Sequence, residues 1–435
     1  MGRLPRPACH LVAATLGIAL ALARPESGAA EPQSIQEKLD RHDEKSKPQV
    51  PGRWRKVRDA PELTEEQRAQ LDELAAIGYL GGVVPESRSG VVAYSAEAAW
   101  DGVNIYTSGH GPSALLMDMD GTVLHEWTYS YERAFPGAEP CPGDLCDSWR
   151  KTTLLPNGDL IAIFEGAGII RVDRESELIW ARDLAAHHDQ EVLSDGRILV
   201  LTREPRLIPE IHETFFTLED FISVLDEHGA ELERHSIYDA ILRSPWTDIL
   251  PEPSTSAGDL LHTNTLHRLD GSIEERVPAF RAGNLLISLN KRGALAVWDA
   301  DTRALSWIYR GPRHGQHDPQ ILPNGNLLYF DNRRGEAASR IVELDPATEE
   351  IVWTYEGSEA APFYSATCGT VQRLPNGNTL IAESDRGRAF EVDSDRRIVW
   401  EFYNPERAGE GGEFIATIFD LQRIPWDDVD DWLPE

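Results

Sequence analysis

The sequence predicts an all-β protein, a six-bladed β-propeller with a short helical extension at its N-terminal end. Two repeated turns support this prediction. The first is a Leu-Pro-Asn-Gly turn or a variant of it, found at 155–158, 193–196, 269–271, 322–325 and 374–377. The second opens with Asp and usually closes with Trp, and is found at 118–127, 173–180, 226–235, 299–307, 345–353 and 393–400. The Asp openings recur about every 50 residues, a period typical of propeller blades.

The turn at 322–325 indicates how each repeat is built. It lies in the stretch GQHDPQILPNGNLLYFDN, residues 315–332, where an Asn-Gly pair separates two apolar runs. Such a pair is a strong hairpin signal, because a type I′ turn needs positive φ at both central residues. The incoming strand starts five residues before the turn leucine. The same count in the five copies gives Arg150, His188, Asn264, His317 and Gly369.

These positions predict a shared site. Equivalent residues of successive blades face one axis, and His262 lies on the same strand face as Asn264, because side chains alternate along a strand. One arginine and three histidines are therefore expected at one mouth of the central channel. Such a cluster suits an anionic ligand, and convergent polar groups in a concavity are the usual mark of a binding site.

The composition argues against nucleic acid as a partner. The formal net charge is −31, whereas binding to phosphate backbones demands a basic face. The 435-residue length would allow several domains, but the repeats run from about 90 to 430 without a break. We therefore assign residues 89–435 to one propeller. The sequence does not indicate an oligomeric state.

The N-terminal segment has the pattern of an exported protein. Arg3 and Arg6 precede an apolar run, and small residues follow up to Ala30. The run is shorter than the roughly 20 apolar residues that span a bilayer, so we expect 1–30 to be a cleaved signal peptide and the mature chain to have no membrane span. Residues 31–88 are expected to form a polar linker and one amphipathic helix from about 64 to 78. The expected location is periplasmic or secreted.

Three cysteines would remain in the mature chain. Cys141 and Cys146 are close in sequence and, in an exported protein, are expected to form a disulfide that closes a small loop. No metal site is expected, because no second Cys or His pair follows at finger spacing. Cys368 is then unpaired and is expected to be a small buried core residue.

Several segments resemble the bacterial arylsulfotransferase family. They are 315–332 followed by SRIVELD, DLLHTN at 259–264, YTS at 106–108, and DMDG at 118–121 with His-Glu-Trp at 125–127. The resemblance covers most of residues 90 to 410. It implies an exported six-bladed propeller that moves a sulfuryl group from a phenolic sulfate ester to a phenol without a nucleotide sulfate donor. The implied partners are these two small molecules, and no cofactor is expected.

The family's mechanism uses a transiently sulfated histidine, with other histidines and an arginine around the sulfuryl group. His262 matches the histidine of the family's Asp-x-x-His-x-Asn segment, and His317 matches the one before the Phe-Asp-Asn strand. An arginine after that strand is implied to bind the sulfuryl oxygens. Arg334 and Arg340 both fit, because a guanidinium fork holds two oxygens of a tetrahedral anion. With these four as catalytic candidates, the substrate-binding candidates are Arg150, His188, Asn264 and Asn332.

One feature departs from the family's pattern. The family's sulfated histidine lies in a later blade, and no histidine follows His317 in this chain. Cys368 and Tyr364 are the nearest nucleophilic side chains in that region. Either His188, His262 or His317 is the nucleophile, or the site binds sulfate esters without a covalent step.

The preferred scheme has a neutral His317 or His262 attack sulfur, an arginine stabilise the equatorial oxygens, and a second histidine move the proton. Two other functions stay open, because a fold does not determine function. One is a non-catalytic propeller that binds an anionic ligand or a protein partner. The other is a different enzyme, such as a hydrolase or a quinone-dependent oxidoreductase. The quinone enzyme is disfavoured because the Trp motifs close the outer turns of blades and show no Cys pair or carboxylate set for a cofactor and its metal.

Overall fold

The computed structural model describes residues 53–56, 88–139, 141, 145–252, 258–311, 315–336, 338–359, 361–409, 412 and 414–433. The expected signal peptide at 1–30 and the expected amphipathic helix at 64–78 lie outside these residues. Strands dominate the described part of the chain, which contains two short α-helices, α3 (Tyr131–Ala134) and α4 (Ile237–Leu242). No helix within it has the length and apolar character needed to cross a membrane.

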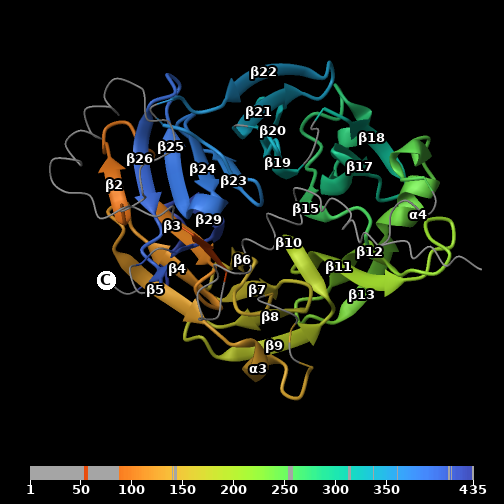
Figure 1. The fold of residues 1–435 in the computed structure, drawn as a ribbon, viewed down its shortest axis with the longest axis horizontal. Helices are drawn as coiled ribbons and strands as arrows, with labels where there is room; N and C mark the ends of the chain where they lie inside the picture. The colour runs from red at the N-terminus through yellow and green to blue at the C-terminus, as the bar shows by residue number, and fades with distance from the viewer. Residues whose placement is uncertain are drawn as a thin grey trace, which may run out of the picture. The chain divides into compact units, whose positions relative to one another are not determined.

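Six sheets surround a central channel, as the repeats predicted (Figure 1). From the inner to the outer strand, blade 1 is β29 (Ile418–Ile424), β3 (Val103–Ser108), β4 (Ser113–Met117) and β5 (Val123–Thr128). Blade 2 is β6 (Lys151–Leu154), β7 (Leu160–Phe164), β8 (Gly168–Val172) and β9 (Leu178–Asp183). Blade 3 is β10 (Ala186–Val192), β11 (Ile198–Arg206), β12 (Thr217–Leu225) and β13 (Glu231–Ser236), and β14 (Gly258–Asp259) pairs with β12.

The other three blades follow the same plan. Blade 4 is β15 (Thr263–Arg268), β16 (Leu285–Leu289), β17 (Ala294–Trp298) and β18 (Leu305–Tyr309). Blade 5 is β19 (Gln316–Ile321), β20 (Leu327–Asp331), β21 (Arg340–Asp345) and β22 (Glu350–Tyr355). Blade 6 is β23 (Thr370–Arg373), β24 (Thr379–Glu383), β25 (Arg388–Val392), β26 (Ile398–Tyr403) and β2 (Gly90–Tyr94). Five single-turn 3-10 helices connect strands or follow the last one: η1 (Thr247–Ile249), η2 (Pro278–Phe280), η3 (Asn290–Arg292), η4 (Ser384–Arg386) and η5 (Trp426–Asp428).

The repeated Asp and Trp residues have distinct structural jobs. Asp118 opens its turn by accepting hydrogen bonds from the backbone N–H of residues 120 and 122 through Oδ1, the local pattern that favours Asp at turns. Three of the closing tryptophans, Trp127, Trp180 and Trp400, donate a hydrogen bond to the neighbouring blade instead. Trp127 donates its indole N–H to Gly158 O at 2.9 Å, and Trp400 donates to Met119 O at 2.9 Å. The repeat therefore specifies both the turn within a blade and the contact between blades.

The last strand of the chain closes the ring. β29 is the innermost strand of blade 1 and pairs antiparallel with β3. Arg423 of β29 is fully buried and forms an ion pair with Glu391 of blade 6. Its guanidinium also donates to Asn104 Oδ1 at 2.8 Å and lies 4.7 Å from the centre of the Trp400 ring. One buried cation thus joins the first blade to the last.

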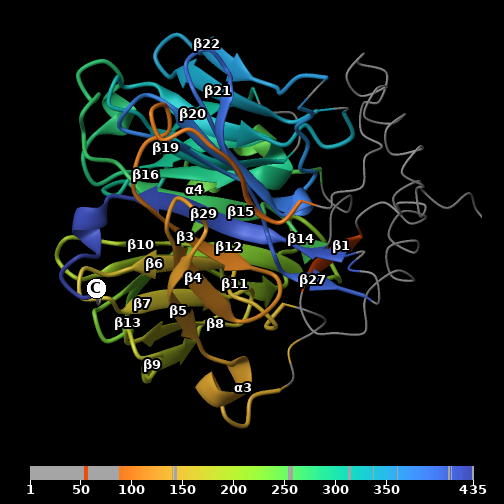
Figure 2. The ribbon, with the colours of Figure 1, turned by 90° about the vertical axis from the view of Figure 1, so that its left-hand side faces the viewer.

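Two strands near the N-terminal end lie elsewhere than the sequence suggested. The repeats were expected to start at about residue 90, but β2 is the fifth strand of blade 6, the last blade, where it pairs with β26. β1 (Trp54–Lys56) falls in the expected linker and pairs with β28 (Phe414–Ala416), which in turn pairs with β27 (Arg407–Ala408). Figure 2 shows β1 and β27 close together. β1 and β2 are edge strands that do not follow either of the two repeated turns, so the sequence pattern did not reveal them.

Candidate active site

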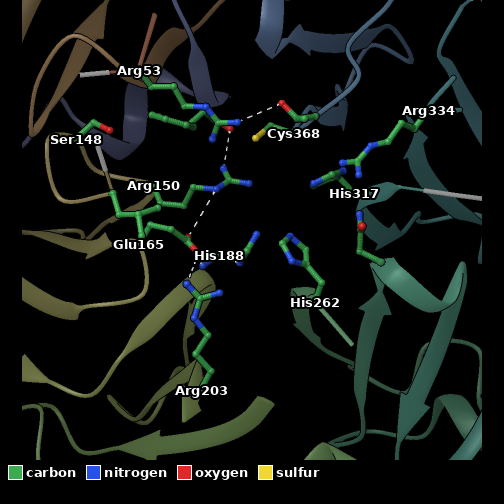
Figure 3. Close-up of a pocket in the computed structure, with 14 residues that line it drawn as sticks. Arg53, Ser148, Arg150, Glu165, His188, Arg203, His262, His317, Arg334 and Cys368 are labelled. Atoms are coloured by element: carbon green, nitrogen blue, oxygen red, sulfur yellow. Dashed lines mark hydrogen bonds and ion pairs between the residues drawn. The ribbon is translucent and has the colours of Figure 1, made fainter. Parts of the chain in front are cut away.

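A cavity of about 260 Å³ opens where the innermost strands begin. Its walls come from several blades and from a segment before the propeller (Figure 3). They carry four arginines, three histidines and a single carboxylate, Glu165. The lining residues are Arg53, Leu145, Ser148, Arg150, Glu165, His188, Arg203, His262, Asn290, His317, Arg334, Thr367, Cys368 and Phe419.

His317 is held in one orientation by Asn332. The Asn332 amide group donates to the backbone oxygens of Ser365 and Cys368, so its Oδ1 faces the imidazole and accepts from His317 Nδ1 at 2.6 Å. This leaves Nε2 as the unprotonated nitrogen of the neutral ring. Burial, with the nearby Arg150 charge, lowers the pKa of His317 to about 3. The ring is neutral at physiological pH and points into the cavity (Figure 3).

His262 has a carboxylate partner. Its Nδ1 is hydrogen-bonded to Asp259 Oδ2, and Lys291 Nζ lies 3.3 Å from the same oxygen. Burial would raise the pKa of Asp259, but the hydrogen bond and charge of His262, together with Lys291, lower it well below its ordinary value. Asp259 is therefore an anion that orients His262 and stabilises positive charge on the ring.

The ring of His188 lies next to the ring of His262, with the two ring centres 4.6 Å apart. Its backbone N–H donates to Glu165 Oε2 at 3.0 Å, and its Nδ1 is 3.0 Å from Nδ1 of His187. Burial, together with His262 and Arg150, lowers the pKa of His188 well below the usual value. His188 and His262 both adopt left-handed backbone angles, with φ of 56° and 51°. Such strain in residues other than glycine is common at functional sites.

Three guanidinium groups face one another around the histidines. Glu165 lies 3.9 Å from Arg150 and 3.5 Å from Arg203, longer than the roughly 2.8 Å of a charge-assisted hydrogen bond. Arg334 donates to Ala366 O at 3.3 Å. Within the described residues, no other carboxylate lies at ion-pair distance from these three arginines. The cavity therefore has a positive excess inside a strongly acidic chain.

The sequence-predicted site residues separate into two groups. Arg150, His188, His262, His317 and Arg334 all line the cavity. The remaining three, Asn264, Asn332 and Arg340, lie outside its lining.

Asn264 donates to Gln316 O at 2.8 Å, because a bulge between Thr263 and Leu266 interrupts the alternation that was expected to align it with His262. Arg340 binds its cross-strand neighbour Asp331 at 2.9 Å. Asn332 acts on the cavity through His317.

Sequence reasoning missed Glu165 and Arg203, although a simple count finds them, because each lies seven residues after a blade-turn glycine, Gly158 or Gly196. It also missed Asn290, which lies seven residues after Gly283 and not after the turn glycine Gly271. The second strand of each blade runs from that turn back to the cavity, so the residue that ends its buried run reaches the mouth. Asn332 occupies the same position after Gly325.

Blade 6 provides no side chain at its ring position. Gly369 has φ of 118°, and a Cβ atom there would lie 2.6 Å from the Phe330 ring, so a larger residue would be strained. Cys368 directly before it is a buried free cysteine that lines the cavity. The expected disulfide joins Cys141 to Cys146.

A comparison with family models shows to which protein family this chain belongs. The model of the arylsulfotransferase (ASST) family matches residues 151–405, more than half of the chain. The chain belongs to the arylsulfotransferase family. This confirms the resemblance read from the sequence motifs, and membership implies small aryl molecules as substrates. No curated protein matches the sequence significantly.

Solved structures similar to this arylsulfotransferase-family chain are distant. A protein of unknown function from Bacteroides caccae is 13% identical, with a TM-score of 0.46 and coverage of 74% of this chain and 98% of that one. The virginiamycin B lyase of Staphylococcus aureus is 11% identical, with a TM-score of 0.41 and coverage of 77% and 96%. The Myceliophteria thermophila Cps50 (Swd1) β-propeller domain is 10% identical, with a TM-score of 0.43 and coverage of 72% and 90%. Similarity at this level says nothing about ligands.

One group in this family member has the residue types of a metal site. The ligand atoms of Glu165, His187 and His188 lie within 4.8 Å of one another. The Nδ1 atoms of the two histidines are, however, 3.0 Å apart and share a hydrogen bond, and Arg150 and Arg203 face the carboxylate. The positive charges of Arg150 and Arg203 therefore disfavour binding of a metal cation at this place.

A second cavity of about 390 Å³ lies farther along the same inner strands. Lys151, Asp189 and Asp318 line it, and Lys151 Nζ lies 3.1 Å from Asp420. Burial raises the pKa of Asp189 to about 7, although Lys151 opposes the shift, and burial also raises the pKa of Asp318. The carboxyl groups of Asp189, Asp318 and Asp420 therefore share the single ammonium group of Lys151.

Replacing Asp189 by Asn is expected to reduce the pH dependence of stability. A carboxyl whose pKa is raised by folding stabilises the folded state at low pH, and this contribution is lost as the pH rises from about 4 to about 7. The wild-type free energy of unfolding should fall over this window by up to about 4 kcal/mol more than that of the variant. Urea unfolding at pH 4.5 and 7.5 measures the difference. Equal changes in both proteins would contradict the assignment.

Proposed function

We propose that this arylsulfotransferase-family protein transfers a sulfuryl group from an aryl sulfate to a phenol through a covalent intermediate on His317. The observation that carries the proposal is the hydrogen bond from His317 Nδ1 to Asn332, which leaves a neutral ring with its Nε2 toward the arginine-lined cavity. This arrangement supports a role for His317 in place of the histidine that the family has in a later blade.

In the first step the Nε2 lone pair attacks the sulfur atom. The S–N bond forms as the bond between sulfur and the aryl oxygen breaks, and the phenoxide leaves. In the second step the oxygen of an acceptor phenol attacks the same sulfur, and the S–N bond breaks to restore neutral His317. The group that is transferred is SO₃, and no oxidation occurs.

His262 moves the proton in both steps. It gives a proton to the leaving phenoxide and later takes one from the acceptor phenol, so the two steps leave its protonation unchanged. The ionised Asp259 stabilises the imidazolium form. Arg334 and Arg150 flank His317 and stabilise the charge on the sulfuryl oxygens.

The test is a transfer assay with 4-nitrophenyl sulfate as donor and phenol as acceptor. Ping-pong kinetics and a protein mass increase of one SO₃ group, trapped without acceptor and mapped to His317, are the expected results. Transfer without a trapped adduct and with sequential kinetics would overturn the covalent step. Binding of the donor without any turnover would favour a non-catalytic binding propeller.

We infer that the protein works outside the cytoplasm. The disulfide between Cys141 and Cys146 supports this location, because such bonds persist in oxidising compartments. The signal-like pattern at 1–30 agrees with it. Detection of the protein in the periplasmic or culture fraction, with a mature N-terminus near residue 31, is the expected result.

A further inference from the structure

We propose that the preferred sulfate donor carries a second anionic group, such as a ring carboxylate, which Arg203 binds opposite the sulfuryl site. The inference rests on the proposed sulfuryl transfer at His317. It adds a substrate class that family membership does not specify, namely aryl sulfates that are dianions.

The charges of the cavity call for more than one negative charge. Arg150, Arg203 and Arg334 face only one carboxylate, Glu165, within the described lining. His188 and His317 are neutral because burial lowers their pKa values. Counted without Arg53, which bonds Thr367, and without the His262–Asp259 pair, whose charges cancel when His262 is protonated, these three arginines and one carboxylate leave two positive charges. A monoanionic aryl sulfate compensates one of them, whereas a dianion compensates both.

The arginines lie on different sides of the cavity. Figure 3 shows Arg334 beside His317 and Arg203 on the opposite side, below His188. The charges that act most strongly on His317 include Arg150 and Arg334, whereas Arg203 acts on His188. Arg203 is therefore not placed to hold the oxygens of a sulfuryl group bound to His317. It is placed to bind another part of the same molecule.

Arg203 also has N–H donors beyond those that face Glu165. Its only ion pair within the described residues is the 3.5 Å contact with Glu165, which Arg150 and the His188 N–H share. A guanidinium has five N–H donors and binds a carboxylate through two of them. Gly166, which follows Glu165 in the chain, leaves room for the Arg203 guanidinium. A Cβ atom at position 166 would lie 2.4 Å from Arg203 Nη2.

The size of the cavity restricts the ligand further. Its volume of about 260 Å³ lies below the usual range for drug-sized ligands, roughly 300–1,000 Å³. One aromatic ring with a sulfate at one end and a carboxylate at the other suits such a space. Phe419 offers an apolar wall for the aromatic ring of the ligand, and the centre of its own ring lies 5.5 Å from Arg150 Cζ.

The experiment compares 4-sulfooxybenzoate with its methyl ester as donors, with phenol as the acceptor. The ester group withdraws electrons more strongly than the carboxylate, so leaving-group chemistry alone favours the methyl ester. The wild-type kcat/KM is nevertheless expected to be about 10-fold or more higher for the carboxylate, the scale of one charged hydrogen bond. Arg203→Gln is expected to remove most of this preference.

Arg197→Gln provides the matched control. Arg197 is an exposed arginine of the same blade, paired with Asp195 in a surface turn, and its replacement should leave the donor preference intact. Equal kcat/KM values for the two donors in the wild type would overturn the inference and leave sulfuryl transfer standing. A preference that persists in Arg203→Gln would overturn the role of Arg203.

Failure of the proposed function is distinguished by binding. If neither donor turns over, isothermal calorimetry of the two compounds decides the question. Tighter binding of the carboxylate, lost in Arg203→Gln, would support the second anion site although sulfuryl transfer had failed. Equal binding of both compounds would overturn the inference as well.

Discussion

His317→Ala is expected to lower the rate of sulfuryl transfer by about four orders of magnitude or more, the scale seen when a covalent nucleophile is removed. The variant lacks the nitrogen that bonds to sulfur, so both half-reactions fail. Its cavity still contains Arg150 and Arg334, and donor binding should persist. Turnover in the aryl sulfate assay, donor affinity by calorimetry and the mass of the trapped protein measure the three parts of this expectation.

Two further variants sharpen the result. His228→Ala alters a histidine whose side chain is 80% exposed, and its turnover should match the wild type. His262→Ala should retain the trapped adduct with a donor whose phenoxide needs no protonation, such as 4-nitrophenyl sulfate. An adduct that survives in His317→Ala and disappears in His262→Ala would assign the nucleophile to His262 instead.

Glu391→Ala is expected to lower the free energy of unfolding by about 3–5 kcal/mol, because it leaves a buried charge without a partner. The side chains of Glu391 and Arg423 are both fully buried, and they join blade 6 to β29, the innermost strand of blade 1. Glu391 also accepts hydrogen bonds from Asn378 at 2.6 Å and from the Trp100 N–H at 2.9 Å. Chemical denaturation at pH 7 measures the loss.

An exposed ion pair provides the comparison. Glu175 pairs with Arg174 at 2.7 Å, with both side chains about half or more exposed, and Glu175→Ala should cost less than about 1 kcal/mol. The double variant Glu391→Leu with Arg423→Met should recover part of the stability lost in Glu391→Ala, since apolar residues can replace a buried pair. A loss in Glu391→Ala no larger than that of Glu175→Ala would show that the pair does not hold the ring closed.

The blades could be predicted because their turns repeat. Each turn needs particular residues, Gly for positive φ and Asp for its side-chain hydrogen bonds, so the same letters recur wherever the geometry recurs. The turn at 322–325 is not the expected type I′ turn, because Gly325 has positive φ and Asn324 does not. β1 and β2 could not be predicted in this way. They add to existing edges through backbone hydrogen bonds, and such pairing leaves little mark on the sequence.

The site was predictable to the extent that the ring position recurs from blade to blade. Counting from the turn leucine placed Arg150, His188 and His317 in the lining of the cavity, although the incoming strands of His188 and His317 contain bulges as well. The bulge after Thr263 moved Asn264 away from His262, and bulges have no dependable sequence signal. The choice between Arg334 and Arg340 depended on a cross-strand partner, Asp331, that only the paired strands reveal.

Closure by β29 has a consequence for how the protein is made. β3 leaves the ribosome more than 300 residues before the strand it pairs with, as the partners Ser108 and Ile418 show. Loop-closure entropy makes such distant pairing slow. Until the final strand emerges, the nascent chain carries an open β edge that can pair with other chains. A stop codon before residue 418 would therefore remove few residues but leave blade 1 without its innermost strand and with an open edge that promotes aggregation.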